Sequence, residues 1–373
     1  MSRQRRRRGV RQQITEVQRL ARKWEKGVAR TMAENGKVRA EVLSGRAALL
    51  FVLCCLSSAA CQQAKVPGAE SLNSLRGKAE KGDANTQYDL CIRYANGKDI
   101  YQDHPEAFRW CQKAAEQGHT AAQALLGVMY NFGQGVPQDY GAAVRWYRKA
   151  AEQGHTGAQY SIGVMYAHGE GVPRDYAEAA RWWREAADRG DVRAQYKLGI
   201  MYEEGEGVPP DFAEAFRWYR KAAQQGHADA QFDLGSMYDQ GQGVKQDYAE
   251  AVRWYGKAAD QGIAAAQSNL GQKYYFGQGV PQDYAEAARW YGKAVEQGDD
   301  FARYYLGLMY AEGRGVTQDY VVAYMLLDLS ASNSSNRVLE EMWASARDKI
   351  SKSMTPHQIA EAQRLAREWK PKQ

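Results

Sequence analysis

Apolar residues recur along most of this chain at helical spacing. In HTAAQALLGVMY (residues 119–130) they follow a helical period, and one Gly is the only residue that disfavours a helix. The stretch NFGQGVP (131–137) then ends the helix with glycines. Asp139 begins a second helix, whose next copy, DYAEAARWWREAA (175–187), ends at another glycine. The pattern predicts two antiparallel helices, A and B, joined by a short loop.

This helix pair repeats every 36 residues. The interval separates six tryptophans (Trp110, Trp146, Trp182, Trp218, Trp254, Trp290) and seven glycines (Gly82, Gly118, Gly154, Gly190, Gly226, Gly262, Gly298). A helix pair cannot bury its apolar face alone, so consecutive units must stack on one another. The sequence therefore predicts an all-α solenoid with seven units in residues 76–336, rather than several compact domains.

Three features of each unit have structural interpretations. In several units, an Asp at the start of helix B precedes a Glu by three residues, which predicts an N-cap whose Glu reaches back as in a capping box; among these are Asp175, Asp211, Asp247 and Asp283. The Gly of each Leu-Gly pair, such as Gly127, is expected to let a neighbouring helix approach closely. The repeated Trp of helix B is expected to fill the core between helices.

The repeating pattern resembles a known family. It reads A-x-x-x-L-G-x-M-Y, then G-x-G-V-x-x-D-Y-x-x-A-x-x-W-Y-x-K-A-A-x-x-G, and it resembles the Sel-one-like repeats, relatives of the tetratricopeptide repeats, over about residues 76–330. The resemblance implies a right-handed superhelix whose A helices line a concave face. It also implies an adaptor that assembles other proteins, often at membranes or in bacterial envelopes. One cysteine-rich branch of the family is associated with β-lactam binding and hydrolysis.

We therefore expect a non-enzymatic scaffold that binds a protein or peptide; the alternative is a hydrolase acting on β-lactams or cell-wall fragments. The GQGV and GEGV stretches lack the Lys-Ser/Thr of a phosphate-binding loop. His119, His155 and His227 occupy a position where other units have Asp, which favours a helix cap over a metal ligand. No cofactor or metal is expected.

Charge and hydropathy separate the N-terminal region from the repeats. Residues 1–60 carry fourteen Lys and Arg against four Asp and Glu, while the remainder is slightly acidic, so no nucleic-acid partner is expected. An apolar run at residues 47–60 follows basic residues and is too short to span a bilayer. We interpret residues 1–31 as a basic leader that is either non-native or disordered. We interpret residues 32–60, starting at Met32, as a signal peptide and 61–75 as a linker. Export to the periplasm or outer membrane is expected.

The cysteines bear on both export and folding. Ser58-Ala59-Ala60-Cys61 resembles a bacterial lipobox, which makes Cys61 a candidate for lipidation and membrane anchoring; Ser58 and Ala60 also suit ordinary signal peptidase cleavage. Cys91 and Cys111 stand where other units have Gly and Tyr. In an oxidising compartment they could form a disulfide that joins the two helices of the first unit; two buried thiols are the alternative. Because the cysteine-rich branch has a pair in most units, its β-lactam activity is not carried over to this chain.

A candidate binding surface follows from positions that vary between units. Within helix A these are 121, 125, 128 and 132 and their counterparts, which form one stripe. Its character changes along the chain from apolar to basic, acidic and aromatic, which would suit an extended peptide or a partner helix; neutral drift of an exposed surface is the alternative. The candidate partner-binding residues are Leu125, Phe132, His168, Arg193, Lys197, Glu204, Asp229, Asp233, Asn269, Phe276, Phe301 and Tyr305.

The two ends of the chain carry nearly the same helix. Residues 13–24 and 358–369 are identical at nine of twelve positions. Residues 337–373 are predicted to cap the solenoid, with Thr355 and Pro356 at a helix start. The first copy precedes the expected signal peptide, so we interpret it as the remnant of a related neighbouring gene, with translation starting at Met32; the alternative is a translated, functional helix in a protein that is not exported.

Overall fold

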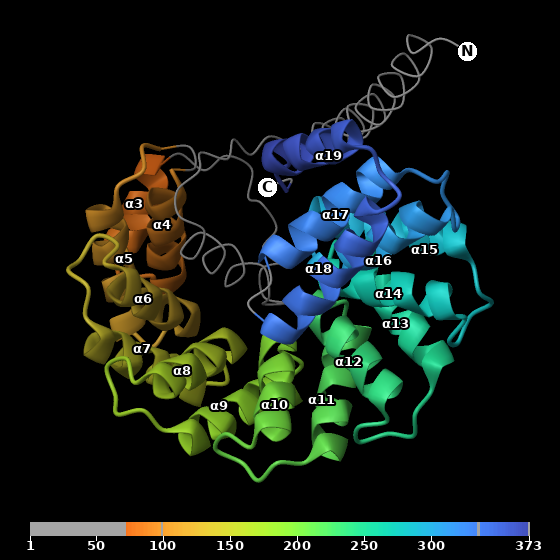
Figure 1. The fold of residues 1–373 in the computed structure, drawn as a ribbon. Coiled ribbons are helices and arrows are strands. Elements are labelled where there is room, and N and C mark those ends of the chain that lie inside the picture. The colour runs from red at the N-terminus through yellow and green to blue at the C-terminus, as the bar shows by residue number, and fades with distance from the viewer. Residues whose placement is uncertain (1–71, 98–99, 334–335, 372–373) are drawn as a thin grey trace. The chain divides into compact units, whose positions relative to one another are not determined.

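The computed structural model describes residues 72–97, 100–333 and 336–371, and all regular elements in these ranges are α-helices (Figure 1). Helix α3 (Leu72–Glu80) comes first, and α18 (Arg337–Ser351) and α19 (Pro356–Glu368) come last. Seven helix pairs lie between them: α4 (Ala84–Asn96) and α5 (His104–Glu116), α6 (Thr120–Phe132) and α7 (Tyr140–Glu152), α8 (Thr156–His168) and α9 (Tyr176–Asp188), α10 (Val192–Glu204) and α11 (Phe212–Gln224), α12 (Ala228–Gln240) and α13 (Tyr248–Asp260), α14 (Ala264–Phe276) and α15 (Tyr284–Glu296), α16 (Asp300–Glu312) and α17 (Tyr320–Asn333).

The pairs stack in the order of the chain. Each helix A packs against helix B of its own pair, and each helix B packs against helix A of the next pair. The all-α solenoid of 36-residue helix pairs predicted from the sequence is thus confirmed, while its right-handed superhelical sense stays a prediction. Below, the pairs are called repeats 1 to 7.

The helix ends follow from the residues at the caps. The Asp175 carboxylate accepts hydrogen bonds from the backbone N–H groups of Ala177 and Glu178, which begins α9. At the end of α8, Gly169 adopts a left-handed conformation with φ of 74°, which costs glycine little. The N-cap prediction is therefore confirmed. The predicted reach of Glu178 back to the cap is not what the structure shows, because its carboxylate binds Arg181 at 2.7 Å.

The repeated histidines are helix caps, as predicted. Nδ1 of His119, His155 and His227 each accepts a hydrogen bond from the backbone N–H three residues later, which begins the A helix that follows. Burial lowers the pKa of all three imidazoles below the usual value, so each is held in the neutral form that can accept this bond. Their role accounts for the exchange with Asp191 and Asp299 in other repeats.

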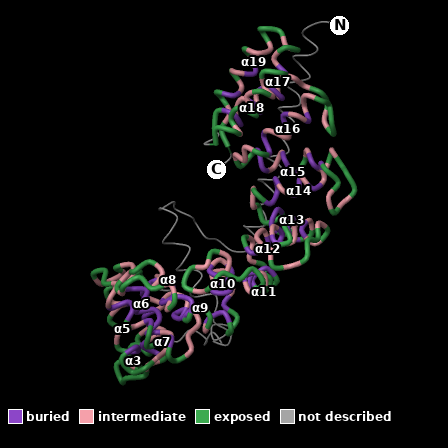
Figure 2. Tube along the Cα trace, turned by 60° about the horizontal axis from the view of Figure 1, so that its bottom comes forward, coloured by how far each residue is buried: buried purple, intermediate pink, exposed green. Residues whose placement is uncertain are grey.

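The core is continuous from one repeat to the next. One cluster combines Ala179 and Trp183 of α9, Leu198 and Met201 of α10, and Trp218 of α11. Buried positions face neighbouring helices and exposed ones gather in the loops (Figure 2). Five of the six repeated tryptophans are buried, while Trp146 is only partly buried. The predicted packing role is therefore confirmed, and the apolar burial that stabilises each repeat depends on its neighbour.

The Gly of each Leu-Gly pair makes room for a side chain of its partner helix. A Cβ atom on Gly127 would lie 2.6 Å from the ring of Tyr147, and one on Gly235 would lie 2.7 Å from the ring of Tyr255. Gly307 faces Leu327 in the same way. The predicted close approach is confirmed, and the group that approaches is an inserted side chain of helix B.

Helix α19 covers the last repeat. Thr355 and Gln358 form a complete capping box at its start. Ala362 and Ala366 are buried, and the Trp369 ring lies 4.2 Å from the Arg303 guanidinium, a cation–π contact. Arg303 stands where earlier repeats have a buried Gln, so the capping tail and the last repeat differ from the standard unit together. The earlier copy of this helix lies outside the described residues, as do Met32, the apolar run and Cys61.

Candidate functional site

The predicted stripe along the A helices is mainly a surface, with one exception. Leu125 is only 8% exposed and belongs to the core, so its prediction as a partner-binding residue is wrong. The other predicted residues lie at intermediate or exposed positions: Phe132, His168, Arg193, Lys197, Glu204, Asp229, Asp233, Asn269, Phe276, Phe301 and Tyr305. They occupy separate helices of repeats 2 to 7, so they share a face without converging on one point.

The aromatic end of the stripe combines exposed rings with a supporting cluster. Phe276 and Phe301 are about half exposed, at 49% and 50%. Tyr305 follows Phe301 by one helical turn on α16, and its ring centroid lies 6.0 Å from that of Phe276. The Phe301 ring meets Trp343 edge-on at 5.4 Å. The two phenylalanines thus expose apolar surface while their other sides are held by neighbouring rings.

The acidic middle of the stripe lies on α12, and Glu203 of α10 lies next to it. The Tyr219 hydroxyl donates a hydrogen bond to Glu203 at 2.6 Å, and the ring of Tyr196 stacks on His227 at 4.4 Å. Burial, together with the nearby Glu203 and Asp229 carboxylates, raises the pKa of Asp233 to about 6, although a hydrogen bond with Tyr196 opposes the shift. A cation placed here would be attracted by three carboxylates.

The basic section is partly committed to internal contacts. Arg193 binds Asp191, the N-cap of α10, at 2.8 Å, and its guanidinium lies 4.3 Å from the centroid of the Tyr160 ring. Arg193 therefore holds the start of its own helix in place as well as contributing charge to the stripe.

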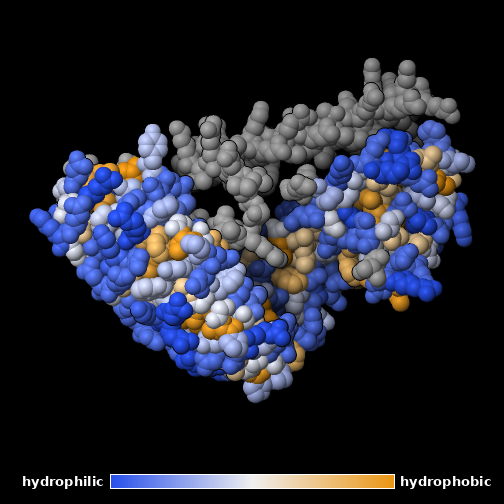
Figure 3. Space-filling view, turned by 90° about the vertical axis from the view of Figure 1, so that its left-hand side faces the viewer, coloured by the Kyte–Doolittle hydropathy of each residue, from blue (hydrophilic) through white to orange (hydrophobic). Residues whose placement is uncertain are grey.

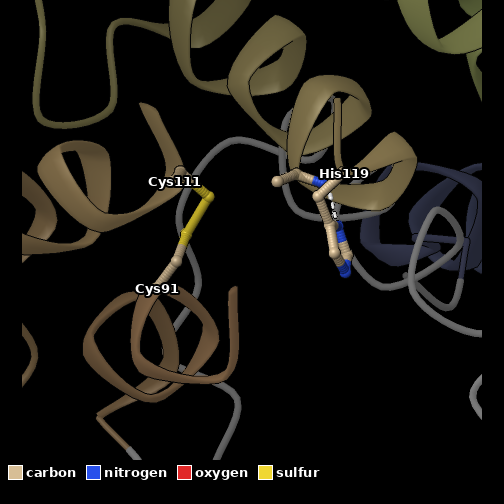
Figure 4. The surroundings of a disulfide bond; sticks show 4 residues. Cys91, Cys111 and His119 are labelled. Atoms are coloured by element: carbon tan, nitrogen blue, oxygen red, sulfur yellow. Dashed lines mark hydrogen bonds between the residues drawn. A yellow bond between two sulfur atoms is a disulfide. The ribbon is translucent and has the colours of Figure 1, made fainter. Parts of the chain in front are cut away.

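Cys91 and Cys111 form a disulfide between α4 and α5, with their Cα atoms 5.1 Å apart and both residues fully buried (Figure 4). Figure 4 also shows the nearby His119 and its capping bond. These cysteines replace the Gly–Tyr contact found in repeat 2 between Gly127 and Tyr147. In the first repeat, a disulfide thus joins helices A and B at the position where repeat 2 packs a tyrosine ring against a glycine.

Sequence reasoning missed one group of residues, at the contact between repeats 2 and 3. Arg148, Glu152, Gln159, Glu185 and Arg189 line a cavity of about 470 Å³ there. Aligning the repeats reveals these residues: Glu185 replaces a Lys, and Arg189 replaces a Gln, that most other repeats have. These two substitutions change local charge without disturbing the repeat pattern, so a search for familiar motifs passes over them.

Metal-ion clusters and membrane-spanning helices are both absent from the described ranges. Residues 72–97, 100–333 and 336–371 contain no group of three or more His, Cys, Asp or Glu side chains that could hold a metal ion. In that part of the chain, no helix is both long and apolar enough to cross a membrane.

Stacked 36-residue helix pairs with a variable face define a class, the α-helical repeat solenoids. Comparison identifies the family within that class: the Sel1 repeat model matches seven consecutive segments, 84–119, 120–155, 156–191, 192–227, 228–263, 264–299 and 300–335. The chain therefore belongs to the Sel1 repeat family, whose members are generally non-enzymatic scaffolds for protein–protein interaction.

A solved structure with the same repeat supports this assignment. A Sel1 repeat protein from Oxalobacter formigenes is 32% identical, with a TM-score of 0.60, and the match covers 83% of this chain and 97% of that one. A protective antigen of uropathogenic Escherichia coli that displays this repeat fold is 30% identical, with a TM-score of 0.47, over 79% of this chain and 86% of that one. A search of the curated proteins found no match.

Proposed function

We propose that this protein is a non-enzymatic scaffold that binds a protein segment along the A-helix stripe. The observation that carries the proposal is the exposure of Phe276 and Phe301 on that stripe, next to rings that fix their positions. Anchored, exposed aromatic residues are typical of the centres of protein interfaces, because they bury apolar area with little loss of side-chain freedom. The concave face expected of the family would present them together.

The charges along the stripe support a partner of particular chemistry. Asp229 and Asp233 form the acidic section of the stripe on α12, with Glu203 of α10 beside it, and the aromatic section follows on α14 and α16. A segment with basic residues followed by apolar anchors would complement both.

We also propose that the protein acts in a bacterial cell envelope, exported by the segment at 32–60 and anchored through a lipid on Cys61. The support is the order of basic residues, apolar run and small residues before that cysteine. The disulfide between Cys91 and Cys111 is consistent with an oxidising compartment. Intact mass of the protein from its native cells tests this: an acylated chain beginning at Cys61 is expected, and a chain beginning at Met1 would contradict export.

Variants of the stripe test the scaffold itself. Phe276→Ala and Phe301→Ala should each weaken binding of the native partner at least tenfold, since each removes an interface anchor. Phe212→Ala is the matched control, because Phe212 is 43% exposed but begins helix B of its repeat, away from the stripe. Equal retention of the partner by all three variants, measured by quantitative affinity purification, would contradict the assignment of the stripe.

A further inference from the structure

Buried glutamines connect most neighbouring repeats. Near the start of α6, the Gln123 side chain donates to the Ala115 carbonyl at 3.1 Å, and its own Oε1 accepts a bond from Gln153 Nε2 at 2.7 Å. Gln153 is the C-cap of helix B in the same repeat. Equivalent Gln–Gln bonds join Gln117 to Gln87, Gln225 to Gln195, Gln261 to Gln231 and Gln297 to Gln267. Each buried amide in these pairs therefore has both a donor and an acceptor satisfied.

Repeat 3 departs from this arrangement. Gln159 is only 1% exposed, and its Nε2 donates to the Ala151 carbonyl at 3.3 Å and to Glu185 at 3.1 Å. Its Oε1 is buried without a hydrogen-bond partner. The cause is Arg189, which takes the place of the bonding Gln; its guanidinium lies beside Gly154, where an added Cβ would be 2.9 Å from Nη1. A buried acceptor left unpaired destabilises a fold, so the departure calls for a compensating role.

A second substitution lies beside the first. Five other repeats have Lys where repeat 3 has Glu185, and each of those lysines lies over the repeated Trp of its own helix, for example Lys221 over Trp218 at 3.8 Å. In repeat 3, Glu185 instead holds the Gln159 amide and lies 3.5 Å from Arg181. Glu185 and Arg189, which differ in charge from the residues of the other repeats, thus both lie near the unpaired oxygen of Gln159.

The cavity between repeats 2 and 3 contains all of these groups. It measures about 470 Å³ and is lined by three arginines and three glutamates, with Gln159, Tyr166, Trp182 and Ala151 completing it; the charged residues are Arg148, Arg181, Arg189, Glu152, Glu178 and Glu185. Arg181 is paired with Glu178, and Arg148 donates to the Tyr166 hydroxyl at 2.7 Å. The lining is balanced in charge and mostly polar, which favours a small polar ligand of both charges over an apolar one.

We propose that this cavity binds the zwitterion of a free α-amino acid. Its ammonium group would bind the carboxylates of Glu185 and Glu152, beside the buried Gln159 side chain. Its carboxylate would bind the guanidinium of Arg189 or Arg148, the geometry in which Arg recognises carboxylates well. The site is separate from the stripe on the A helices, so it does not depend on the proposed scaffold function.

The chain provides its own control variant. The double variant Glu185→Lys/Arg189→Gln restores the residues of the sibling repeats, which removes the acidic group and supplies Gln159 Oε1 with its usual donor. Because five other repeats fold with these residues, this variant should fold, and its melting temperature without ligand should be higher than that of the wild type.

Binding is measured by isothermal titration calorimetry on the full chain with each of the twenty common amino acids. At least one should bind the wild type at a single site, and the double variant should bind it at least tenfold more weakly. The N-acetylated form and the carboxamide form of that amino acid should also bind at least tenfold more weakly. The proposal is overturned if no amino acid binds, if the double variant binds equally well, or if either blocked form binds as tightly.

Discussion

Substitution at the contact between Gly235 of α12 and Tyr255 of α13 tests how each helix pair is held together. Tyr255 is 1% exposed, and its hydroxyl contacts Ser236 at 3.2 Å and Asp239 at 3.4 Å. A Cβ at Gly235 would lie 2.7–3.3 Å from three ring atoms. Gly235→Ala therefore forces a buried and anchored ring to move, although alanine itself favours a helix.

A glycine in the same repeat supplies the control. Gly256 also lies within a helix, and nothing comes within 4 Å of an added Cβ. Gly256→Ala should stabilise the protein by about 1 kcal/mol through helix propensity alone. At Gly235 the same gain is opposed by an overpacking cost of about 1–3 kcal/mol. The two variants should therefore differ by about 1–3 kcal/mol, with Gly235→Ala the less stable.

Urea unfolding followed by circular dichroism gives the free energies, and both variants change the same repeat, so the transitions are comparable. Hydrogen exchange of the α12 and α13 amides provides a local measure: protection should fall in Gly235→Ala and hold or rise in Gly256→Ala. Equal stability of Gly235→Ala and Gly256→Ala would contradict the close packing of the Tyr255 ring against Gly235.

Three other predictions concern the ends of the solenoid and its caps. The double variant Cys91→Ser/Cys111→Ser should lower the free energy of unfolding by about 3 kcal/mol, the chain-entropy value for a link spanning 20 residues. The variant Cys91→Gly/Cys111→Tyr restores the Gly–Tyr contact of most other repeats, so its free energy of unfolding should fall by less in the same urea experiment. Because the pKa of His155 is lowered in the folded state, the unfolded chain binds more protons, and wild-type stability should fall as the pH drops below about 6.5. The variant His155→Asp should reduce this loss of stability between pH 7 and pH 5. An unchanged pH dependence would refute the assignment of His155 as a neutral cap. Trp369→Ala should destabilise the last repeat by about 1–2 kcal/mol by removing the contact with Arg303, with hydrogen exchange in α16 rising and that in α6 unaffected.

The fold could be predicted from the sequence because its determinants are local and repeated. Asp175 at a helix start, Gly169 at a helix end and Trp218 in the core each recur in register, so one unit predicts the others. The histidine caps were predictable for the same reason, since His and Asp alternate at one position.

The remaining details depend on contacts between units, which the period alone does not reveal. The stripe position of Leu125 varies in sequence, yet packing makes it part of the core. Glu178 is well placed for a capping box, but the Arg181 guanidinium one turn later competes for it. Gln159 Oε1 has no hydrogen-bond partner because Arg189 replaces the Gln that donates to it in sibling repeats, and this loss is visible only once the hydrogen bonds are known.

Site-specific photo-crosslinking in the native cells tests whether a partner binds the A-helix stripe, as proposed. A photoreactive amino acid is placed at Phe276 or Phe301 on the stripe, or at Arg217, whose side chain is 72% exposed on helix B of its repeat. We expect the same discrete crosslinked partner from both stripe positions and none from Arg217. A partner crosslinked equally from Arg217, or only from there, would contradict it.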